Sequence, residues 1–168
     1  MNRAAPIAAL VLSLLPPLAA LAAGAPPSSE PLFAATLTDL ADRPVKLAGF
    51  RGRPLVINFW ARWCPPCLDE IPDIVDTRAR FKSRGLEVIG IAIDDSTSSV
   101  RQFAGRFHIE YPILLAKDQG FGLLQALGDA VGGLPYTLVV NRDGSVVARK
   151  LGRMSKSEMD MAFAAALN

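Results

Sequence analysis

Residues 51–67 read Arg-Gly-Arg-Pro-Leu-Val-Ile-Asn-Phe-Trp-Ala-Arg-Trp-Cys-Pro-Pro-Cys, and this stretch decides the fold. Its middle part, residues 54–60, is an apolar run with one polar residue, Asn58, which is typical of a strand buried on both faces. Cys64 and Cys67 follow this run, and the chain has no other cysteine. The stretch therefore predicts a buried strand that leads directly into a cysteine pair.

The residues from Cys64 to about Lys82 are predicted to form a helix, because their apolar side chains fall on one side of a helical wheel. These side chains are Ile71, Ile74, Val75 and Phe81. Pro72 lies inside the segment and is expected to kink the helix. Two cysteines three residues apart at a helix N-terminus lie on one side of the first turn, close enough to form a disulfide.

We interpret the cysteines as a redox pair. Unsatisfied backbone donors and the positive end of the helix dipole favour a thiolate at Cys64 and lower its pKa below the free value of about 8.5. That thiolate attacks a substrate disulfide, and the Cys67 thiol then resolves the mixed disulfide. Pro65 and Pro66 suit a first helical turn, where an N–H group would have no partner.

Two other roles for the cysteine pair are a structural disulfide and a metal site. A structural disulfide usually joins distant segments, and a bridge across three residues closes too small a loop to stabilise much. A zinc-type site needs about four ligands, whereas the chain offers two cysteines and a single histidine, His108. We therefore expect redox catalysis with no metal and no cofactor, and we expect His108 to be a packed or surface residue.

Strands and helices alternate along the rest of the chain. Strands are predicted within residues 33–47 around a turn at 41–44, at 86–93, at 111–115, and at 136–140 and 145–150 as a hairpin. Further helices are predicted after a capping box at Ser99 and Gln102, at residues 121–127, and after a second capping box at Ser155 and Glu158. This order indicates an α/β fold, a mixed sheet flanked by helices.

Length and charge narrow the classes of function. A chain of 168 residues suggests one domain with a substantial core. The net charge is +2 and the sequence has no basic cluster, so nucleic acid is not an expected partner.

The first thirty residues differ in composition from the rest. Arg3 precedes an apolar core at residues 7–15, and Ala-Leu-Ala at 20–22 offers a cleavage site, so residues 1–22 are predicted to be a signal peptide. An uncleaved membrane anchor is the alternative, although the adjacent prolines at 16 and 17 suit a spanning helix poorly. Both interpretations place the chain outside the cytoplasm, and we expect the periplasm. Residues 23–31 are predicted to be a linker and 32–168 the folded domain.

Residues 51–67 resemble the signature of the thioredoxin superfamily and, within it, of the exported TlpA/ResA-like thiol–disulfide reductases. Residues 68–72 continue the likeness, with Pro72 at the family's helix-kinking proline. Residues 86–118 resemble the strand–helix insertion that separates this branch from plain thioredoxin. The resemblance implies a thioredoxin-like fold with an N-terminal strand extension and a strand–helix insertion.

The resemblance also implies roles for single residues. Pro135, which follows Leu134, matches the superfamily's cis-proline, which lies against the active-site disulfide and helps to hold an extended substrate. Trp63 matches an aromatic residue that shapes the docking surface, beside Pro65 and Pro66. An ordinary trans proline at the start of a strand is the alternative for Pro135.

Glu70 matches a family carboxylate next to the cysteines. Its spacing argues the same way, because a residue three positions after Cys67 shares its side of the helix. A carboxylate withdrawn from water has a raised pKa and can accept the Cys67 proton. A solvated surface glutamate is the alternative. Asn58 stands where thioredoxin carries a buried aspartate, which leaves Glu70 as the better proton acceptor.

The resemblance implies an enzyme that keeps cysteines of partner proteins reduced, in cytochrome c maturation or copper-site assembly, with electrons from a membrane thiol donor. We expect the enzyme to be a monomer. The pair Pro135-Tyr136 departs from the Pro-Glu pair of the cytochrome-maturation branch, which counts against a dedicated haem role. A thiol oxidase or disulfide isomerase is an alternative, because the direction depends on how far the reduced form is stabilised. A Cu(I)-binding chaperone is another, because thiolates favour Cu(I).

Overall fold

The apolar run after Pro54 forms β3 (Leu55–Trp60), in which every residue is buried. It pairs in parallel with β4 (Glu87–Ala92) and antiparallel with β6 (Tyr136–Val140), so it lies at the centre of a sheet. The computed structural model describes residues 28–94 and 96–168. Burial on both faces explains why β3 reads as a continuous apolar run in the sequence.

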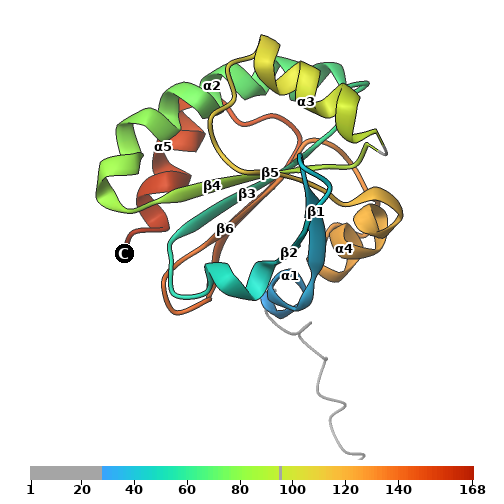
Figure 1. Ribbon diagram of the computed structural model, residues 1–168. Coiled ribbons are helices and arrows are strands. Elements are labelled where there is room, and N and C mark those ends of the chain that lie inside the picture. Colours follow the sequence, from blue (N-terminus) through green and yellow to red (C-terminus); the bar gives the residue numbers. More distant parts are fainter. Residues whose placement is uncertain (1–27, 95) are drawn as a thin grey trace, which may run out of the picture.

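The mixed sheet has seven strands in the order β2-β1-β5-β4-β3-β6-β7 (Figure 1). The remaining strands are β1 (Thr36–Asp39), β2 (Pro44–Lys46), β5 (Ile113–Leu115) and β7 (Val146–Leu151). β3, β4 and β5 run parallel to one another, and the other neighbouring pairs are antiparallel. β1 joins the hairpin partner β2 to β5, so the N-terminal extension and the insertion together build one edge of the sheet. The predicted mixed α/β architecture is confirmed.

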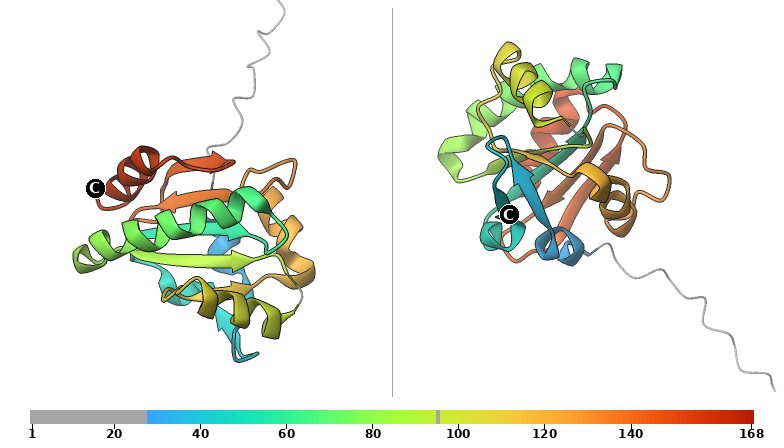
Figure 2. Two further views of the ribbon diagram at one scale, coloured as in Figure 1. Left: turned by 90° about the horizontal axis from the view of Figure 1, so that it is seen from above. Right: turned by 45° about the vertical axis from the view of Figure 1, so that its right-hand side comes forward.

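Helices cover both faces of this sheet (Figures 1 and 2). The longer helices α2 (Pro65–Phe81), α3 (Thr97–Arg106) and α5 (Lys156–Ala165) lie on one face, and the short α1 (Glu30–Ala34) and α4 (Gly120–Ala126) lie on the other. Short 3₁₀ turns η1 (Leu47–Phe50), η2 (Lys82–Arg84) and η3 (Lys117–Gln119) complete the connections. Alternate β3 residues therefore enter two separate cores: Val56 and Trp60 face α2, while Ile57 and Phe59 face α4.

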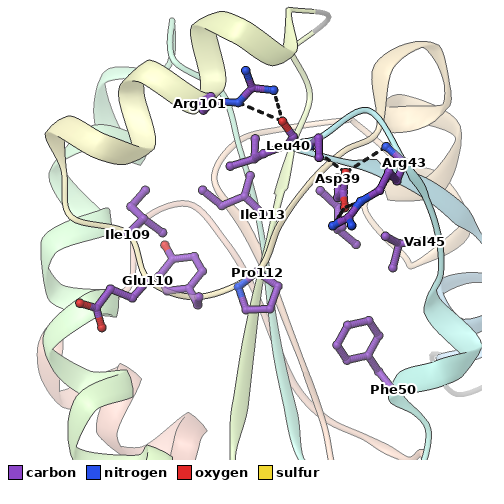
Figure 3. A pocket seen from close by; sticks show the side chains of 13 residues that line it. Asp39, Leu40, Arg43, Val45, Phe50, Arg101, Ile109, Glu110, Pro112 and Ile113 are labelled. Atoms are coloured by element: carbon purple, nitrogen blue, oxygen red, sulfur yellow. Dashed lines mark hydrogen bonds and ion pairs between the residues drawn. The ribbon is translucent and has the colours of Figure 1, made fainter.

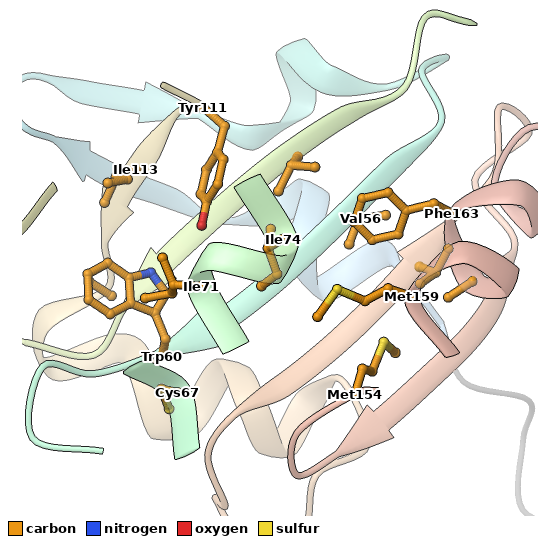
Figure 4. Packing of buried hydrophobic residues seen from close by; sticks show 14 of the residues in the cluster. Val56, Trp60, Cys67, Ile71, Ile74, Tyr111, Ile113, Met154, Met159 and Phe163 are labelled. Carbon is orange, nitrogen blue, oxygen red and sulfur yellow. The ribbon is translucent and has the colours of Figure 1, made fainter. Parts of the chain in front are cut away.

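The core under α2 joins the cysteine pair to the centre of the sheet (Figure 4). Cys67, Ile71 and Ile74 project from α2 onto Trp60 of β3, and Met159 and Phe163 of α5 close the far end of the cluster. Pro72 lies within α2, as predicted. The cysteines are therefore part of the packed core, and the packing of α2 fixes their position.

The start of α3 corrects one sequence expectation. The N-cap is Ser96, whose hydroxyl accepts the Ser99 N–H at 3.3 Å, so Ser99 and Gln102 do not form the predicted capping box. The helix begins three residues earlier because Ser96 provides the capping oxygen. The capping box of Ser155 and Glu158 at α5 is confirmed.

Helix α1 begins at Glu30, inside the segment predicted to be a linker. The Ser29 hydroxyl donates to the Gly144 carbonyl at 2.5 Å, and Leu32 and Phe33 are buried under the sheet. These contacts place the start of the fold a few residues before the predicted boundary at 32. The predicted signal peptide, residues 1–22, lies outside the described residues. Within the described part of the chain, no helix has the length and apolar character needed to cross a membrane.

Candidate active site

The candidate active site is the disulfide between Cys64 and Cys67 at the start of α2. Cys64 is the N-cap residue, and the two Cα atoms are 5.3 Å apart. Cys64 is 5% exposed and Cys67 1% exposed, so Cys64 is the sulfur that a substrate reaches more easily. This order of access fits Cys64 as nucleophile and Cys67 as resolving thiol.

The first turn of α2 offers few N–H groups to a thiolate. Pro65 and Pro66 occupy the first two helical positions and have no N–H. The N–H groups of Cys67 and Leu68 both donate to the Cys64 carbonyl, at 3.0 and 3.2 Å. The expectation of unsatisfied backbone donors at Cys64 is therefore wrong, and the helix dipole is what remains to favour its thiolate.

Glu70 lies one turn after Cys67 and is 1% exposed. Its Oε1 accepts the Met154 N–H at 2.8 Å, and its Oε2 accepts an N–H from the Asn58 side chain at 3.2 Å. The Asn58 amide also donates to the Thr137 hydroxyl at 3.0 Å, so β3 and the loop after β7 hold the carboxyl group, while β6 holds the Asn58 amide. The glutamate is thus inside the protein, and a solvated surface position is excluded.

Burial raises the pKa of Glu70, and the hydrogen bonds from Met154 and Asn58 oppose that rise only in part. A buried carboxylate with a raised pKa binds a proton more readily than a solvated one, which suits a proton acceptor. Sequence spacing located Glu70, whereas Met154 was missed because its contribution is a backbone N–H and carries no side-chain signal. The sequence showed that Asn58 replaces the buried aspartate of thioredoxin, but it did not predict the hydrogen bond from Asn58 to Glu70.

The Leu134–Pro135 peptide bond is cis, as the resemblance implies. Tyr136 pairs with Phe59, so the residues before it run on toward the end of β3 from which the cysteines follow. Leu134 packs partly buried against the cluster that contains Cys64 and Cys67. Antiparallel pairing of β3 and β6 thus brings the two separate motifs to one end of the sheet.

The surface around the disulfide is partly apolar. Trp63 is 62% exposed, and Pro65 and Pro66 are exposed beside it. Trp60, by contrast, is fully buried and contacts Phe103 of α3, with ring centroids 5.0 Å apart. Trp63 is therefore free to contact another molecule, and Trp60 is a core residue.

Asp94 holds the loop between β3 and the cysteines. It follows the end of β4, is 4% exposed, and accepts the Arg62 backbone N–H at 3.0 Å. Its other oxygen pairs with Arg62 Nε at 3.1 Å. Sequence analysis missed Asp94, although a carboxylate directly after a buried strand, at the sheet end that carries the cysteines, was a usable signal.

Another cavity lies between the β1–β2 hairpin and the residues that lead into β5 (Figure 3). Its volume is about 620 Å³, and its apolar lining includes Val45, Phe50 and Ile113. Neither cysteine of the disulfide lines this cavity. Among residues 28–94 and 96–168, no group of three or more His, Cys, Asp or Glu side chains is placed to bind a metal.

The fold and the cysteine pair together define a thioredoxin-like thiol–disulfide oxidoreductase. The family model described as Redoxin matches residues 25–166, and the chain belongs to this family. A thiol-disulfide oxidoreductase ResA from Geobacillus kaustophilus is 33% identical over 133 residues, which cover 79% of this chain and 73% of the relative.

Solved structures agree with this assignment. A thiol:disulfide interchange protein of the thioredoxin family from Chlorobium tepidum superposes with a TM-score of 0.70 at 29% identity, over 80% of this chain and 93% of that one. A secreted disulfide oxidoreductase of Mycobacterium tuberculosis, described as homologous to DsbE of E. coli, gives a TM-score of 0.68 at 24% identity, over 82% and 99% of the two chains. The second likeness shows the fold.

Proposed function

We propose that this enzyme works as a reductant, transferring electrons from the Cys64–Cys67 dithiol to disulfides of partner proteins outside the cytoplasm. The observation that favours reduction over oxidation is that few hydrogen-bond donors stabilise a thiolate at Cys64. Pro65 and Pro66 provide no N–H groups, and the next two N–H groups donate to the Cys64 carbonyl.

The strength of a disulfide as an oxidant depends on how far its reduced form is stabilised, and a strongly stabilised thiolate gives a strong oxidant. The nearest arginine in the sequence, Arg62, is paired with Asp94, which offsets its charge. With few donors and a neutralised cation, the reduced form gains little extra stability. Such a dithiol gives up its electrons readily, which supports reduction over oxidation.

The first half of the reaction forms the mixed disulfide. The Cys64 thiolate attacks one sulfur of the substrate disulfide, a Cys64–substrate S–S bond forms, and the substrate S–S bond breaks. The second substrate sulfur leaves as a thiolate and takes a proton from water. Trp63, Leu134 and Pro135 are proposed to contact the substrate chain at this stage, because Trp63 is exposed directly before Cys64 and Leu134 packs against the cluster that contains both cysteines.

The second half releases the substrate. Glu70 takes the proton of Cys67, the new thiolate attacks Cys64, and the Cys64–Cys67 bond forms as the mixed disulfide breaks. The departing substrate thiolate then receives a proton, which Glu70 can return. In total the substrate gains two electrons and two protons, the enzyme loses them, and a thiol donor must reduce the enzyme again.

We place this reaction in the periplasm, with a membrane thiol carrier as donor and substrates from cytochrome c maturation or copper-site assembly. Copper-site assembly is the better match, since Tyr136 takes the place of an acidic residue after the cis-proline. Tyr136 is 2% exposed and its hydroxyl donates to the Leu127 carbonyl at 2.8 Å, so it presents no charge to a partner. A monomer with residues 1–22 as signal or anchor completes the proposal.

The reduction potential of the Cys64–Cys67 couple tests the direction. Equilibration in thiol buffers, followed by Trp fluorescence, is expected to give a value near or below that of thioredoxin, about −270 mV. A potential near about −120 mV, that of a strong oxidant, would contradict the proposal and favour an oxidase.

The same approach tests the thiolate argument. Replacing both prolines, as in Pro65→Ala with Pro66→Ala, restores two N–H groups to the first turn without adding a charge and is expected to raise the potential. An unchanged reduction potential would show that the prolines do not determine whether the enzyme reduces or oxidises its substrates. Retention of Cu(I) by the reduced protein after dialysis, lost in Cys64→Ser, would instead support a copper chaperone.

A further inference from the structure

A second, polar pocket lies directly beside the disulfide, between the start of α2 and one side of α3. We infer that it binds an acidic side chain of the partner protein, within a few residues of the reacting cysteine, and so selects among substrates. The inference rests on the proposed reaction with protein disulfides. It adds a contact that is separate from the surface around Trp63 and Pro135.

The position of the pocket follows from its lining. Arg62 lies two residues before Cys64, and Leu68 directly follows Cys67, so both ends of the cysteine motif border the cavity. The opposite wall comes from α3, through Ser99, Gln102, Phe103, Arg106 and Phe107. The ribbon views show α3 alongside the beginning of α2 (Figures 1 and 2). Neither cysteine lines the pocket itself, but residues on both sides of the cysteine motif do, so the pocket adjoins the motif.

The buried carboxylate of Asp94 fixes the position of Arg62. Its Nε pairs with Oδ1 of the buried Asp94 at 3.1 Å, and its backbone N–H donates to Oδ2 of the same carboxylate at 3.0 Å. The Arg62 side chain is still 36% exposed. A guanidinium anchored at one edge keeps further N–H donors for a second carboxylate, and little side-chain entropy is lost when it binds.

Arg106 supplies the charge that is not neutralised. It is exposed at the end of α3, and within residues 28–94 and 96–168 its side chain makes no hydrogen bond or ion pair. No acidic side chain lines the pocket, and Ser99 and Gln102 add neutral hydrogen-bonding groups. Two guanidinium groups with one buried carboxylate leave a net positive charge, which is complementary to an Asp or Glu side chain.

The aromatic side of the pocket fits a side chain better than a free ion. Phe103 and Phe107 stack with their centroids 4.3 Å apart, and Phe103 also contacts the buried Trp60. The cavity volume is about 300 Å³, whereas one water molecule occupies about 30 Å³ in the liquid. The methylene groups of a glutamate can lie on the aromatic wall while its carboxylate meets the arginines.

The length of an extended chain determines how far from the substrate cysteine the acidic residue lies in the substrate sequence. Consecutive Cα atoms are about 3.8 Å apart, so a side chain two residues from the bound cysteine lies about 7 Å along an extended substrate. Arg62 and Leu68 are within two residues of the two enzyme cysteines, which is the same scale. An acidic residue two positions before or after the substrate cysteine is therefore the expected ligand.

Matched peptides test this inference with the full-length protein in its reduced form. Two pairs of disulfide-bonded peptides differ only in Glu or Gln, placed two residues before the cysteine in one pair and two residues after it in the other. The second-order rate constant of enzyme oxidation is followed by Trp fluorescence. In at least one pair the Glu peptide is expected to react about three- to ten-fold faster.

Variants show whether the pocket causes that preference. Arg106→Gln should bring the Glu-to-Gln rate ratio close to one, Arg106→Glu should invert it, and Arg106→Lys should restore part of it. Arg142→Gln is the matched control, because Arg142 is exposed in the β6–β7 hairpin at the other end of the sheet, and it should leave the ratio unchanged. Circular dichroism checks that each variant is folded.

The outcomes separate this inference from the proposed reaction. If both members of each pair oxidise the wild-type protein at equal rates, the reaction stands and the acidic subsite is wrong. The subsite is also wrong if a Glu preference survives Arg106→Gln, because another surface then causes it. If no peptide disulfide oxidises the reduced protein, the proposed reaction fails and the subsite fails with it.

Discussion

Glu70 shows how a single residue can connect catalysis to stability. The sheet and the loop after β7 satisfy both carboxyl oxygens, through Asn58 and Met154, yet the side chain is almost fully removed from water. Two neutral hydrogen bonds do not replace the hydration of a carboxylate, so the protonated form is favoured and the pKa is raised. In its charged form Glu70, the proposed proton acceptor for Cys67, therefore lowers the free energy of unfolding.

This cost predicts a pH dependence of stability. Because the pKa of Glu70 is higher in the folded than in the unfolded protein, its contribution is most favourable below about pH 4.5 and is lost as the pH rises through the raised value. Glu70→Gln should abolish that loss, about 1.4 kcal/mol for each unit by which the pKa is raised. Urea unfolding from pH 4 to 8 measures it.

The matched control is Glu110→Gln, at an exposed glutamate. It should leave the pH dependence of wild-type stability unchanged. If Glu70→Gln tracks the wild type across the whole range, its carboxyl group is not the source of the dependence. The same Glu70→Gln protein should resolve mixed disulfides about 10²-fold more slowly, since positioned acid–base groups contribute about 10²- to 10⁴-fold.

At the scale of the strand, β4 needs a glycine at its centre. A Cβ atom on Gly90 would lie 3.0 Å from Trp60 Nε1 and 3.1 Å from Tyr111 Cε2, side chains that Figure 4 shows pointing toward each other beneath α2. Gly90→Ala should therefore destabilise the protein by about 1 to 3 kcal/mol, the usual effect of overpacking. Gly105→Ala, in α3 with no atom within 4 Å, should be neutral or slightly stabilising. Equal unfolding midpoints for the two variants in urea would contradict this account.

At the scale of the helix, two alanine variants can distinguish Ser96, the N-cap of α3, from Ser99, the cap that the sequence predicted. Ser96→Ala removes the oxygen that accepts the Ser99 N–H and should lower the free energy of unfolding by about 1 kcal/mol. Ser99→Ala keeps that capping bond and should change stability by less than half as much. Urea unfolding of both variants measures the difference, and the reverse order would restore the capping box expected from the sequence.

These elements also show what the sequence could predict. The buried strands β3, β4 and β6 were foreseeable because each is a short apolar run next to a turn signal, and α5 because its capping box is unambiguous. The cap of α3 was not, because Ser96, Ser98 and Ser99 all offer a hydroxyl and only the packing of the helix selects one. Helix α1 was missed since a short segment with Pro31 resembles a linker until its contacts with Gly144 and the sheet are known.

The site residues also include some that sequence spacing could predict and others that only the tertiary structure brings together. Cys64, Cys67 and Glu70 lie close together in the sequence, at positions where helical spacing alone brings them to one side of α2. Arg62 and Arg106 are separated by α2, β4 and most of α3, and only the packing of α3 beside α2 brings them to one pocket. Spacing therefore predicts chemistry within an element, and tertiary contacts decide what lies around it.

For the whole molecule, the contacts of α1 predict where the folded unit must begin. Besides the Ser29–Gly144 hydrogen bond, Arg51 binds both carboxylate oxygens of Glu30, at 2.9 and 2.7 Å, and lies 4.4 Å from the Phe33 ring centroid. Leu32 and Phe33 are almost fully buried against the sheet face that α4 also covers. The segment just after the predicted signal peptide thus completes one of the two cores.

Three truncated proteins test that boundary by thermal unfolding. Chains that begin at residue 23 and at residue 28 should unfold at the same temperature, because both keep every contact of α1. A chain that begins at residue 35 loses the burial of Leu32 and Phe33, about 1.5 to 3 kcal/mol each, and should unfold at a clearly lower temperature. If the chain from residue 35 is as stable as the other two, α1 contributes nothing to the domain. If the chain from residue 28 is already less stable, residues 23–27 belong to the fold as well.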